Sequence, residues 1–283
     1  MSFTTFNKAF SRTQYPAGER HVVARDLDAL RSIDAIEATV CNFAELCEVV
    51  VADRILRRND IQVEWFVPYL PFARDDRRNT EADGLEVELA LELVKEIDIV
   101  IADPHSEVTA VLAHFPQEAT VEIMRSKGAM IPMGQTHECL AEGLTAEPII
   151  LIPDAGAAKK VGEWADGADT VQALKTRDPQ TGKLSGFEVI AEDLGGRPCV
   201  IVDDICDGGG TFLGLAKELG KHNAGPLTLI ITHGLFTKGL DELTQAFDRI
   251  YTFGPTDEVP LATTTGRLTR LPFRVLYEKG IRR

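Results

Sequence analysis

The sequence predicts an α/β fold with mainly parallel sheets flanked by helices, and two observations support this prediction. Short apolar runs alternate with helical stretches along the whole chain, and each run ends near Pro, Asp or Gly. Such alternation is typical of parallel strands joined by crossover helices. The chain has 283 residues, of which 44% are hydrophobic. At roughly 150 residues per domain, this length favours about two domains.

Five apolar runs have the length and the flanking residues expected of buried strands. They occupy residues 61–67, 97–102, 149–152, 199–202 and 227–232. Apolar side chains recur with helical spacing over residues 85–95 and again over residues 212–219, where Gly220 follows. These elements are the expected framework of the sheets and their flanking helices.

Two irregular stretches interrupt this pattern. Residues 137–148 are polar and precede a new apolar run, so we expect a domain junction here, with one domain over residues 1–137 and the other over residues 138–283. Residues 176–186 combine Arg, Asp, Pro, Gly, Lys and Ser. This composition predicts a long mobile loop, of the kind that often has a function.

The charge balance argues against two classes of partner. Thirty Lys and Arg against 44 Asp and Glu give a formal net charge of −14, so the long-range field repels nucleic acids and anionic membrane surfaces. An anionic substrate must therefore be met by local cationic side chains, by a metal ion or by backbone N–H groups. We expect a small-molecule substrate, with neither nucleic acid nor a membrane as a partner.

Cysteine usage and the N-terminal segment both favour a cytoplasmic protein. The five cysteines are odd in number and none has C-x-x-C spacing, which argues against a disulfide framework and a zinc ribbon. Residues 1–15 lack the basic and apolar regions of a secretory signal. No apolar run approaches the roughly 20 residues that cross a bilayer.

The segment with the most chemical information is CVIVDDICDGGGT, residues 199–211. Two carboxylates, Asp203 and Asp204, stand at the end of an expected buried strand, and three glycines then lead into an expected helix. Ligands bind at this end of the strands in open α/β sheets, and a glycine loop that opens a helix points backbone N–H groups at an anion. Carboxylates repel phosphate, however, unless they accept hydrogen bonds from sugar hydroxyls or lie near a divalent cation.

A phosphorylated ribose satisfies both halves of this segment. Its 2′ and 3′ hydroxyls would bind the acidic pair, and its phosphate would bind the glycine loop. The candidate binding residues are Asp203, Asp204, Asp207, Gly208, Gly209, Gly210 and Thr211. Two alternatives stay open at this point: a dinucleotide site, because a further glycine at Gly214 gives the spacing G-x-G-x-x-x-G, and an acidic turn with a purely structural glycine loop.

The same segment closely resembles the phosphoribosyl-binding loop of type I phosphoribosyltransferases and their relatives. Further segments resemble motifs of one such group, the ribose-phosphate pyrophosphokinases, in the family's order and approximate spacing. They are YPAGE at 15–19 (F-x-[DN]-x-E in the family), FVPYLPFARDDRR at 66–78 (PYARQDRK), DPHS at 103–106 (DLH), PDAGAAKK at 153–160 (PDAGGAKR), ALKTR at 173–177 (K-x-R) and THGLF at 232–236 (THGIF).

The resemblance implies a fold and a reaction. It implies two type I phosphoribosyltransferase-like domains, each a mainly parallel sheet flanked by helices. Family members transfer the diphosphoryl group of ATP to the C1 hydroxyl of ribose 5-phosphate in a Mg²⁺-dependent reaction, giving phosphoribosyl pyrophosphate and AMP. The N-terminal domain would then form the ATP side and the C-terminal domain the ribose-phosphate loop. A neighbouring chain of a homo-oligomer, a dimer or a hexamer, would complete the ATP site.

The resemblance also implies roles for individual residues. The residues implied to be catalytic are Lys175 and Arg177. They are two positions apart and would project to the same side of an extended loop. The residues implied to contact ATP are Tyr15, Glu19, Arg74, Asp76 and His105. The residues implied to contact Mg²⁺ are His105 and Asp154.

The chain departs from the family at several of these places. Ala17 replaces an Asp or Asn, Asp75 replaces a Gln, and residues 81–88 do not match the stretch that shapes the family's regulatory site. Gly208 and Gly209 stand where the family usually has Thr and then a small residue. This change removes a hydroxyl donor and is expected to widen the phosphate pocket.

A wider pocket leaves a second acceptor open, namely a larger 5-substituted ribose such as ADP-ribose, with the same diphosphoryl transfer. Two alternatives belong to other classes. A phosphoribosyltransferase would need a base-recognition hood and only one domain of this type, and a non-catalytic regulatory subunit should have lost Lys175, Arg177 or Asp203. The expected two domains and the motifs assigned to ATP argue against a phosphoribosyltransferase, and the presence of Lys175, Arg177 and Asp203 argues against a regulatory subunit. Synthesis of phosphoribosyl pyrophosphate is therefore favoured over both.

Overall fold

The computed structural model describes residues 2–75, 81, 84, 86–103, 105, 148–153, 169–177, 184–259 and 263–280. The chain forms two compact units. The first comprises Met1–Thr120, Pro255–Glu258 and Leu276–Arg283, and the second comprises Val121–Gly254 and Val259–Val275. Two short stretches near the C-terminus therefore belong to the N-terminal unit. The expected boundary between residues 137 and 138 lies outside the described residues and stays a prediction.

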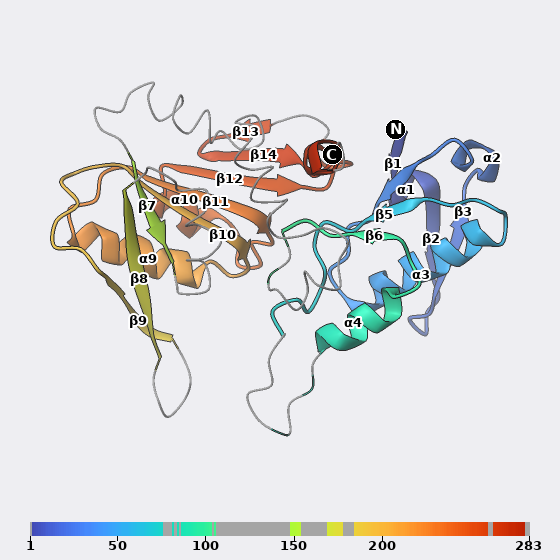
Figure 1. The fold of residues 1–283 in the computed structure, drawn as a ribbon, viewed down its shortest axis with the longest axis horizontal. Helices are drawn as coiled ribbons and strands as arrows, with labels where there is room; N and C mark the ends of the chain where they lie inside the picture. The colour runs from blue at the N-terminus through green and yellow to red at the C-terminus, as the bar shows by residue number, and fades with distance from the viewer. Residues whose placement is uncertain are drawn as a thin grey trace. The chain divides into compact units, whose positions relative to one another are not determined.

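The first unit contains a parallel sheet of four strands in the order β1-β4-β5-β6 (Figure 1). Its strands are β1 (Phe3–Thr5), β4 (Ala35–Glu37), β5 (Glu64–Phe66) and β6 (Ile99–Val100). Its helices are α1 (Phe6–Ala9), α2 (Leu27–Leu30), α3 (Phe43–Arg57) and α4 (Glu86–Val94). Trp65 on β5 is buried in one core with Leu46 and Leu56 of α3, as expected for a parallel sheet covered by helices.

Helix α3 begins at a polar cap directly after the loop that follows β4. The side-chain oxygen Oδ1 of Asn42 accepts a hydrogen bond from the backbone N–H of Glu45 at 3.0 Å. In return, Oε2 of Glu45 accepts one from the backbone N–H of Cys41 at 2.7 Å. The first bond satisfies an N–H group that the first turn of a helix leaves unpaired, and the second ties the residue before the cap to that turn. Local sequence therefore fixes where α3 starts.

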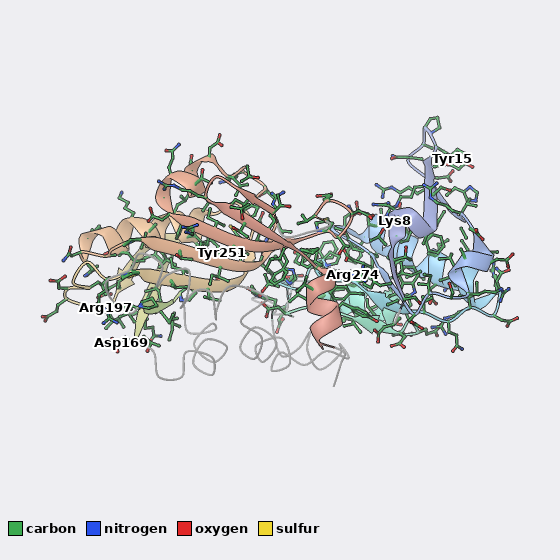
Figure 2. All side chains as sticks on the ribbon, turned by 90° about the horizontal axis from the view of Figure 1, so that it is seen from above. Lys8, Tyr15, Asp169, Arg197, Tyr251 and Arg274 are labelled. Atoms are coloured by element: carbon green, nitrogen blue, oxygen red, sulfur yellow. The ribbon has the colours of Figure 1, made fainter. Side chains whose placement is uncertain are left out.

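Strands β2 (Phe10–Gln14) and β3 (Arg20–Ala24) form a separate antiparallel hairpin in the first unit. At its tip the backbone N–H of Tyr15 donates to the carbonyl of Glu19, and that of Gly18 donates to the carbonyl of Tyr15, both at 2.8 Å. Gly18 has φ +92°, a conformation that glycine adopts without steric cost. Figure 2 shows Tyr15 at the outer end of this hairpin.

The second unit contains an eight-stranded sheet in the order β13-β14-β12-β11-β10-β7-β8-β9 (Figure 1). Its strands are β7 (Ile149–Ile152), β8 (Thr170–Arg177), β9 (Leu184–Val189), β10 (Cys199–Cys206), β11 (Leu227–Gly234), β12 (Arg249–Gly254), β13 (Thr263–Thr265) and β14 (Leu268–Pro272). The helices described near it are α9 (Gly210–Lys221), α10 (Asp241–Ala246) and α11 (Arg274–Gly280). The six inner strands are parallel, and only the edge strands β9 and β13 pair antiparallel.

The structure confirms the predicted α/β class and its parallel sheets. All five expected strands are present: the first two are shorter than predicted, the third has the predicted bounds, and the last two continue to Cys206 and Gly234. Both expected helices are also present, although Gly220 lies inside the second helix rather than after it. No helix in the described part of the chain has both the length and the apolar character needed to cross a membrane.

The prediction of a long loop over residues 176–186 is wrong at both of its ends. Strand β8 continues to Arg177 and β9 begins at Leu184, and the two strands pair with Lys175 opposite Phe187. The sequence did not predict these strand ends, because an antiparallel edge hairpin with a solvated face needs few apolar side chains and its polar residues resemble those of a loop. The residues between the two strands lie outside the described part of the chain.

Candidate functional site

Strand β10 carries the acidic pair, and both aspartates lie inside the strand rather than after it. The strand continues to Cys206, which pairs with Gly234 of β11. The expectation that the strand ends at the two aspartates is therefore wrong, because backbone pairing continues beyond them. Asp203 is half-buried, whereas Asp204 is only 4% exposed. The carboxylate Oδ1 of Asp203 accepts a hydrogen bond from the backbone N–H of Asp204 at 3.0 Å.

The carboxyl end of β10 lies between those of its parallel neighbours β7 and β11. Buried Thr232 and His233, from the THGLF motif, are at the end of β11. The acidic pair and this motif are therefore brought to one edge of the sheet, although they are far apart in the sequence. Asp154 follows β7 but lies outside the described residues, so its contact with Mg²⁺ stays a prediction.

A glycine loop connects β10 to helix α9. Gly209 precedes the first turn of α9 with φ +76°, a backbone conformation that favours glycine, and a Cβ there would lie 3.1 Å from Leu243. No side chain caps this helix start. The first N–H groups of α9, from Gly210 and Thr211, are thus left for a ligand acceptor, and the positive end of the helix dipole favours an anion there.

Backbone hydrogen bonds hold the start of the loop against the segment that follows β11. The N–H groups of Leu235 and Phe236 both donate to the carbonyl of Cys206, at 2.9 and 3.1 Å, and the N–H of Thr237 donates to the carbonyl of Asp207 at 3.0 Å. The hydroxyl of Thr237 also donates to Oδ1 of Asp207 at 2.6 Å. One carboxylate oxygen of Asp207 is therefore engaged within the protein, where it fixes the loop.

Side chains from the segment after β11 lie close to both unusual glycines of the loop. A Cβ at Gly208 would lie 3.2 Å from Cδ and Cε of Lys238, and a Cβ at Gly209 would meet Leu243. The expected widening of the phosphate pocket stays a prediction.

The thiol beside the acidic pair is not suited to be a nucleophile. Burial, reinforced by the charges of Asp203 and Asp207, raises the pKa of Cys206 to about 12. Burial also raises the pKa of Cys199, at the start of the same strand, to about 11. Both thiols are protonated at neutral pH, and the thiolate is the reactive form.

Two of the residues assigned to ATP follow neighbouring strands of the first unit. Arg74 comes after β5 and His105 after β6, and these strands are parallel neighbours, so both residues follow the carboxyl edge of one sheet. The loop before Arg74 is anchored by Phe72, which has φ +68° and stacks on Phe43 with ring centroids 4.0 Å apart. Arg74 is exposed and His105 is half-buried. Asp76 lies outside the described residues.

Tyr15 and Glu19, also assigned to ATP, lie at the tip of the β2–β3 hairpin. Tyr15 is 47% exposed. The exposed position of Tyr15 allows stacking on a base. Lys175 and Arg177, assigned to catalysis, both lie in β8 of the second unit.

A cavity of about 340 Å³ at the foot of this hairpin was not predicted from the sequence. In its wall the buried carboxylate of Glu48 accepts hydrogen bonds from Arg12 at 2.6 Å and from Arg20 at 2.9 Å. The sequence contained one sign of a buried polar site here, because Glu48 and Asp53 interrupt the apolar face of α3. Buried acids are expected to be paired, but the sequence did not indicate which arginines pair with Glu48.

Glu37, at the end of β4, is a second buried acid that borders this cavity. It accepts hydrogen bonds from the backbone N–H of Thr256 at 2.8 Å and from the Thr256 hydroxyl at 2.5 Å. Next to it, the hydroxyl of Thr5 donates to Asp257 at 2.7 Å. Burial raises the pKa of Glu37 to about 7, against the opposing effect of the Thr256 hydrogen bonds.

Metal binding has only limited support from the described side chains. Among them, no group of three or more His, Cys, Asp or Glu is arranged to hold a metal ion. Asp203 and Asp204 are oxygen donors of the type that Mg²⁺ prefers. Of the two residues assigned to Mg²⁺, only His105 is within the described residues.

Comparisons with known proteins place these observations in context. No family model matches the chain. The ribose-phosphate pyrophosphokinase of Mycobacterium tuberculosis is 25% identical over 226 residues, which is 76% of this chain and 67% of the relative. The enzyme of the same name from Shewanella oneidensis is 27% identical over 254 residues, 86% of this chain and 75% of the relative. The enzyme of the same name from Sulfurisphaera tokodaii is 25% identical over 239 residues, which is 83% of this chain and 74% of the relative.

One solved structure matches the whole fold. The phosphoribosylpyrophosphate synthetase of Mycobacterium smegmatis superposes with a TM-score of 0.75, covers 98% of this chain and 97% of its own, and shares 18% sequence identity. This likeness confirms the predicted fold class.

Proposed function

We propose that this chain, a divergent relative of the ribose-phosphate pyrophosphokinases, transfers the diphosphoryl group of ATP to the C1 hydroxyl of ribose 5-phosphate. The products would be phosphoribosyl pyrophosphate and AMP. The observation that carries the proposal is the edge of the second sheet, where β10, its glycine loop and α9 combine two aspartates with an uncapped helix start.

These two features suit the two halves of a ribosyl phosphate. The carboxylates of Asp203 and Asp204 accept hydrogen bonds from the 2′ and 3′ hydroxyls, and the N–H groups of Gly208, Gly210 and Thr211 donate to the phosphate oxygens. Asp207 holds the loop through Thr237. A ligand with only a sugar, or only a phosphate, leaves one half of the site unused.

The reaction exchanges one phosphorus–oxygen bond for another. The C1 hydroxyl oxygen attacks the β-phosphorus of ATP, and the bond from that phosphorus to the α,β-bridging oxygen breaks, so that AMP leaves and the hydroxyl proton passes to solvent. Negative charge spreads over the transferred group, and fixed cations stabilise it. We assign this role to Lys175 and Arg177.

ATP is assigned to the N-terminal unit. Tyr15 stacks on adenine and Glu19 accepts from its amino group, while Arg74 and Asp76 contact the remaining nucleotide. A neighbouring chain of a homo-oligomer completes the site. Mg²⁺, when bound, would neutralise charge on the phosphates of ATP. Because Mg²⁺ at such sites is held mainly by substrate phosphates and one or two protein groups, we assign its protein contacts to His105 and Asp154.

The four cysteines that the structure describes, Cys41, Cys47, Cys199 and Cys206, are free thiols. Free thiols are typical of a reducing compartment. We propose that the enzyme works in the cytoplasm, where ATP is available.

Product analysis by mass spectrometry tests the proposal. The protein is incubated with ATP and Mg²⁺, separately with ribose 5-phosphate and with ADP-ribose. We expect AMP together with ribose 5-phosphate enlarged by a diphosphoryl group. Enlargement of ADP-ribose alone would replace the acceptor, whereas release of pyrophosphate from added phosphoribosyl pyrophosphate and a base would indicate a phosphoribosyltransferase. No ribosyl product with either acceptor would contradict diphosphoryl transfer.

A further inference from the structure

We infer that Lys238 binds the 5-phosphoryl group of the acceptor and supplies the side-chain donor that the loop lacks at Gly208. The inference rests on the proposed function, and it adds a residue outside the motifs that support that function. Lys238 follows THGLF and lies in the turn after β11. It is close to the glycine loop in space, although thirty positions separate it from Gly208 in the sequence.

The stem of Lys238 occupies the place of a side chain at position 208. Its Cδ and Cε lie 3.2 Å, and its Cγ 3.4 Å, from where a Cβ of Gly208 would be. Glycine at 208 therefore accommodates the lysine stem, and a bulkier residue would have to displace it. The ammonium is one bond beyond Cε, so a positive charge with three N–H donors lies beside the loop.

The position of Lys238 is fixed by the turn that carries it. The N–H of Gly239 donates to the carbonyl of Phe236 at 2.8 Å, which closes a tight turn around Thr237 and Lys238. Thr237 binds Asp207 through both its backbone and its hydroxyl. The residue immediately before Lys238 is thus tied to the residue immediately before Gly208.

The charge of Lys238 is available to a ligand. The residue is exposed, and no carboxylate of the described residues forms an ion pair with it. Its apolar stem lies against the loop and the residue as a whole is exposed, the usual arrangement of a lysine that covers a surface. Beside the uncapped start of α9, this cation adds to the attraction for a phosphoryl dianion in a protein whose net charge of −14 otherwise repels one.

Substitution by methionine separates charge from packing, because Lys238→Met keeps an unbranched apolar stem on Gly208. The matched control is Lys217→Met, which removes the same charge from an exposed position on α9, about two turns from the loop. Binding of ribose 5-phosphate to the full chain is measured by calorimetry. ADP-ribose is the probe if the wild type turns over only that acceptor.

We expect Lys238→Met to weaken acceptor binding about ten- to a hundredfold, the size typical of a lost hydrogen bond to a charged group. Lys217→Met should change it less than twofold, Lys238→Arg should retain most of the affinity, and ATP binding should not change in any variant. Equal acceptor affinity in Lys238→Met and Lys217→Met, with a wild type that binds the acceptor, overturns the role of Lys238 alone. A wild type that binds neither acceptor overturns the proposed function together with this inference.

Discussion

Glu37 is a buried acid of the first unit whose ionisation is tied to folding. Its carboxylate is 2% exposed, and burial raises its pKa from 4.5 to about 7. The folded protein therefore binds a proton between these pH values that the unfolded chain releases. The resulting stability is fully present below about pH 4.5 and is lost as the pH rises through about 7.

Substitution Glu37→Gln should remove this dependence. Stability of the wild type is expected to fall by roughly 2 to 3 kcal/mol between pH 5 and pH 8 from this group, whereas Glu37→Gln should show a flatter profile. Urea unfolding at pH 5, 6, 7 and 8 measures the difference. Parallel profiles for the two proteins would contradict the assignment of a raised pKa to Glu37.

Lys175 and Arg177 are the residues to which we assign stabilisation of the transferred group. Replacing both by alanine is predicted to lower AMP release by at least about a thousandfold, because charge stabilisation by such groups supplies much of the catalysis in phosphoryl transfer. AMP formation is followed by chromatography, with the melting temperature of the variant as the control for folding. Undiminished AMP release from a folded double variant would refute the catalytic role.

At the scale of single elements, helix α9 shows how packing constrains the site. A Cβ at Gly214 would lie 2.3 Å from the ring of Phe187 on β9, whereas a Cβ at Gly220 in the same helix meets nothing within 4 Å. The helix whose first N–H groups we assign to the phosphate is thus held against the hairpin that carries the assigned catalytic pair.

This contrast predicts opposite effects of one substitution. Gly214→Ala overpacks the contact and should lower the free energy of unfolding by about 1 to 3 kcal/mol. Gly220→Ala should raise it by about 0.5 to 1 kcal/mol, because alanine is the better helix former. Urea unfolding of both variants provides the comparison, and equal shifts would show that Gly214 does not pack against Phe187.

Buried parallel strands were predictable from the sequence, whereas edge hairpins were not. The strands at 149–152 and 199–202 are continuous apolar runs, because both faces of a parallel strand are buried. The hairpin of β8 and β9 mixes polar and apolar residues, so its sequence resembles that of a loop. The end of β10 was missed for a related reason, since Asp203 and Asp204 interrupt the apolar run but not the backbone pairing.

The sequence predicted the part of the candidate site that lies in one continuous segment, but not the part that depends on contacts between loops. Motif spacing indicated the acidic pair and the glycine loop, because both lie in one continuous segment of the chain. Lys238 was not found, since its contact with Gly208 depends on how two loops dock and not on spacing. At Gly208 the sequence shows a missing side chain but not the neighbouring lysine stem that lies beside it.

At the scale of the whole molecule, the chain returns twice from the second unit to the first. Thr256 binds Glu37, and the hydroxyl of Tyr277 donates to Glu64 at 2.6 Å. These contacts join residues more than two hundred positions apart, which no local pattern predicts. The first unit is therefore incomplete without two stretches from near the C-terminus.

The most direct test of the account is a crystal structure of the protein with ribose 5-phosphate. We expect the phosphate against N–H groups of the glycine loop and the start of α9, and the 2′ and 3′ hydroxyls within hydrogen-bond distance of Asp203 and Asp204. A phosphate bound elsewhere, or a pentose that does not touch either aspartate, would contradict the assignment of this sheet edge as the acceptor site.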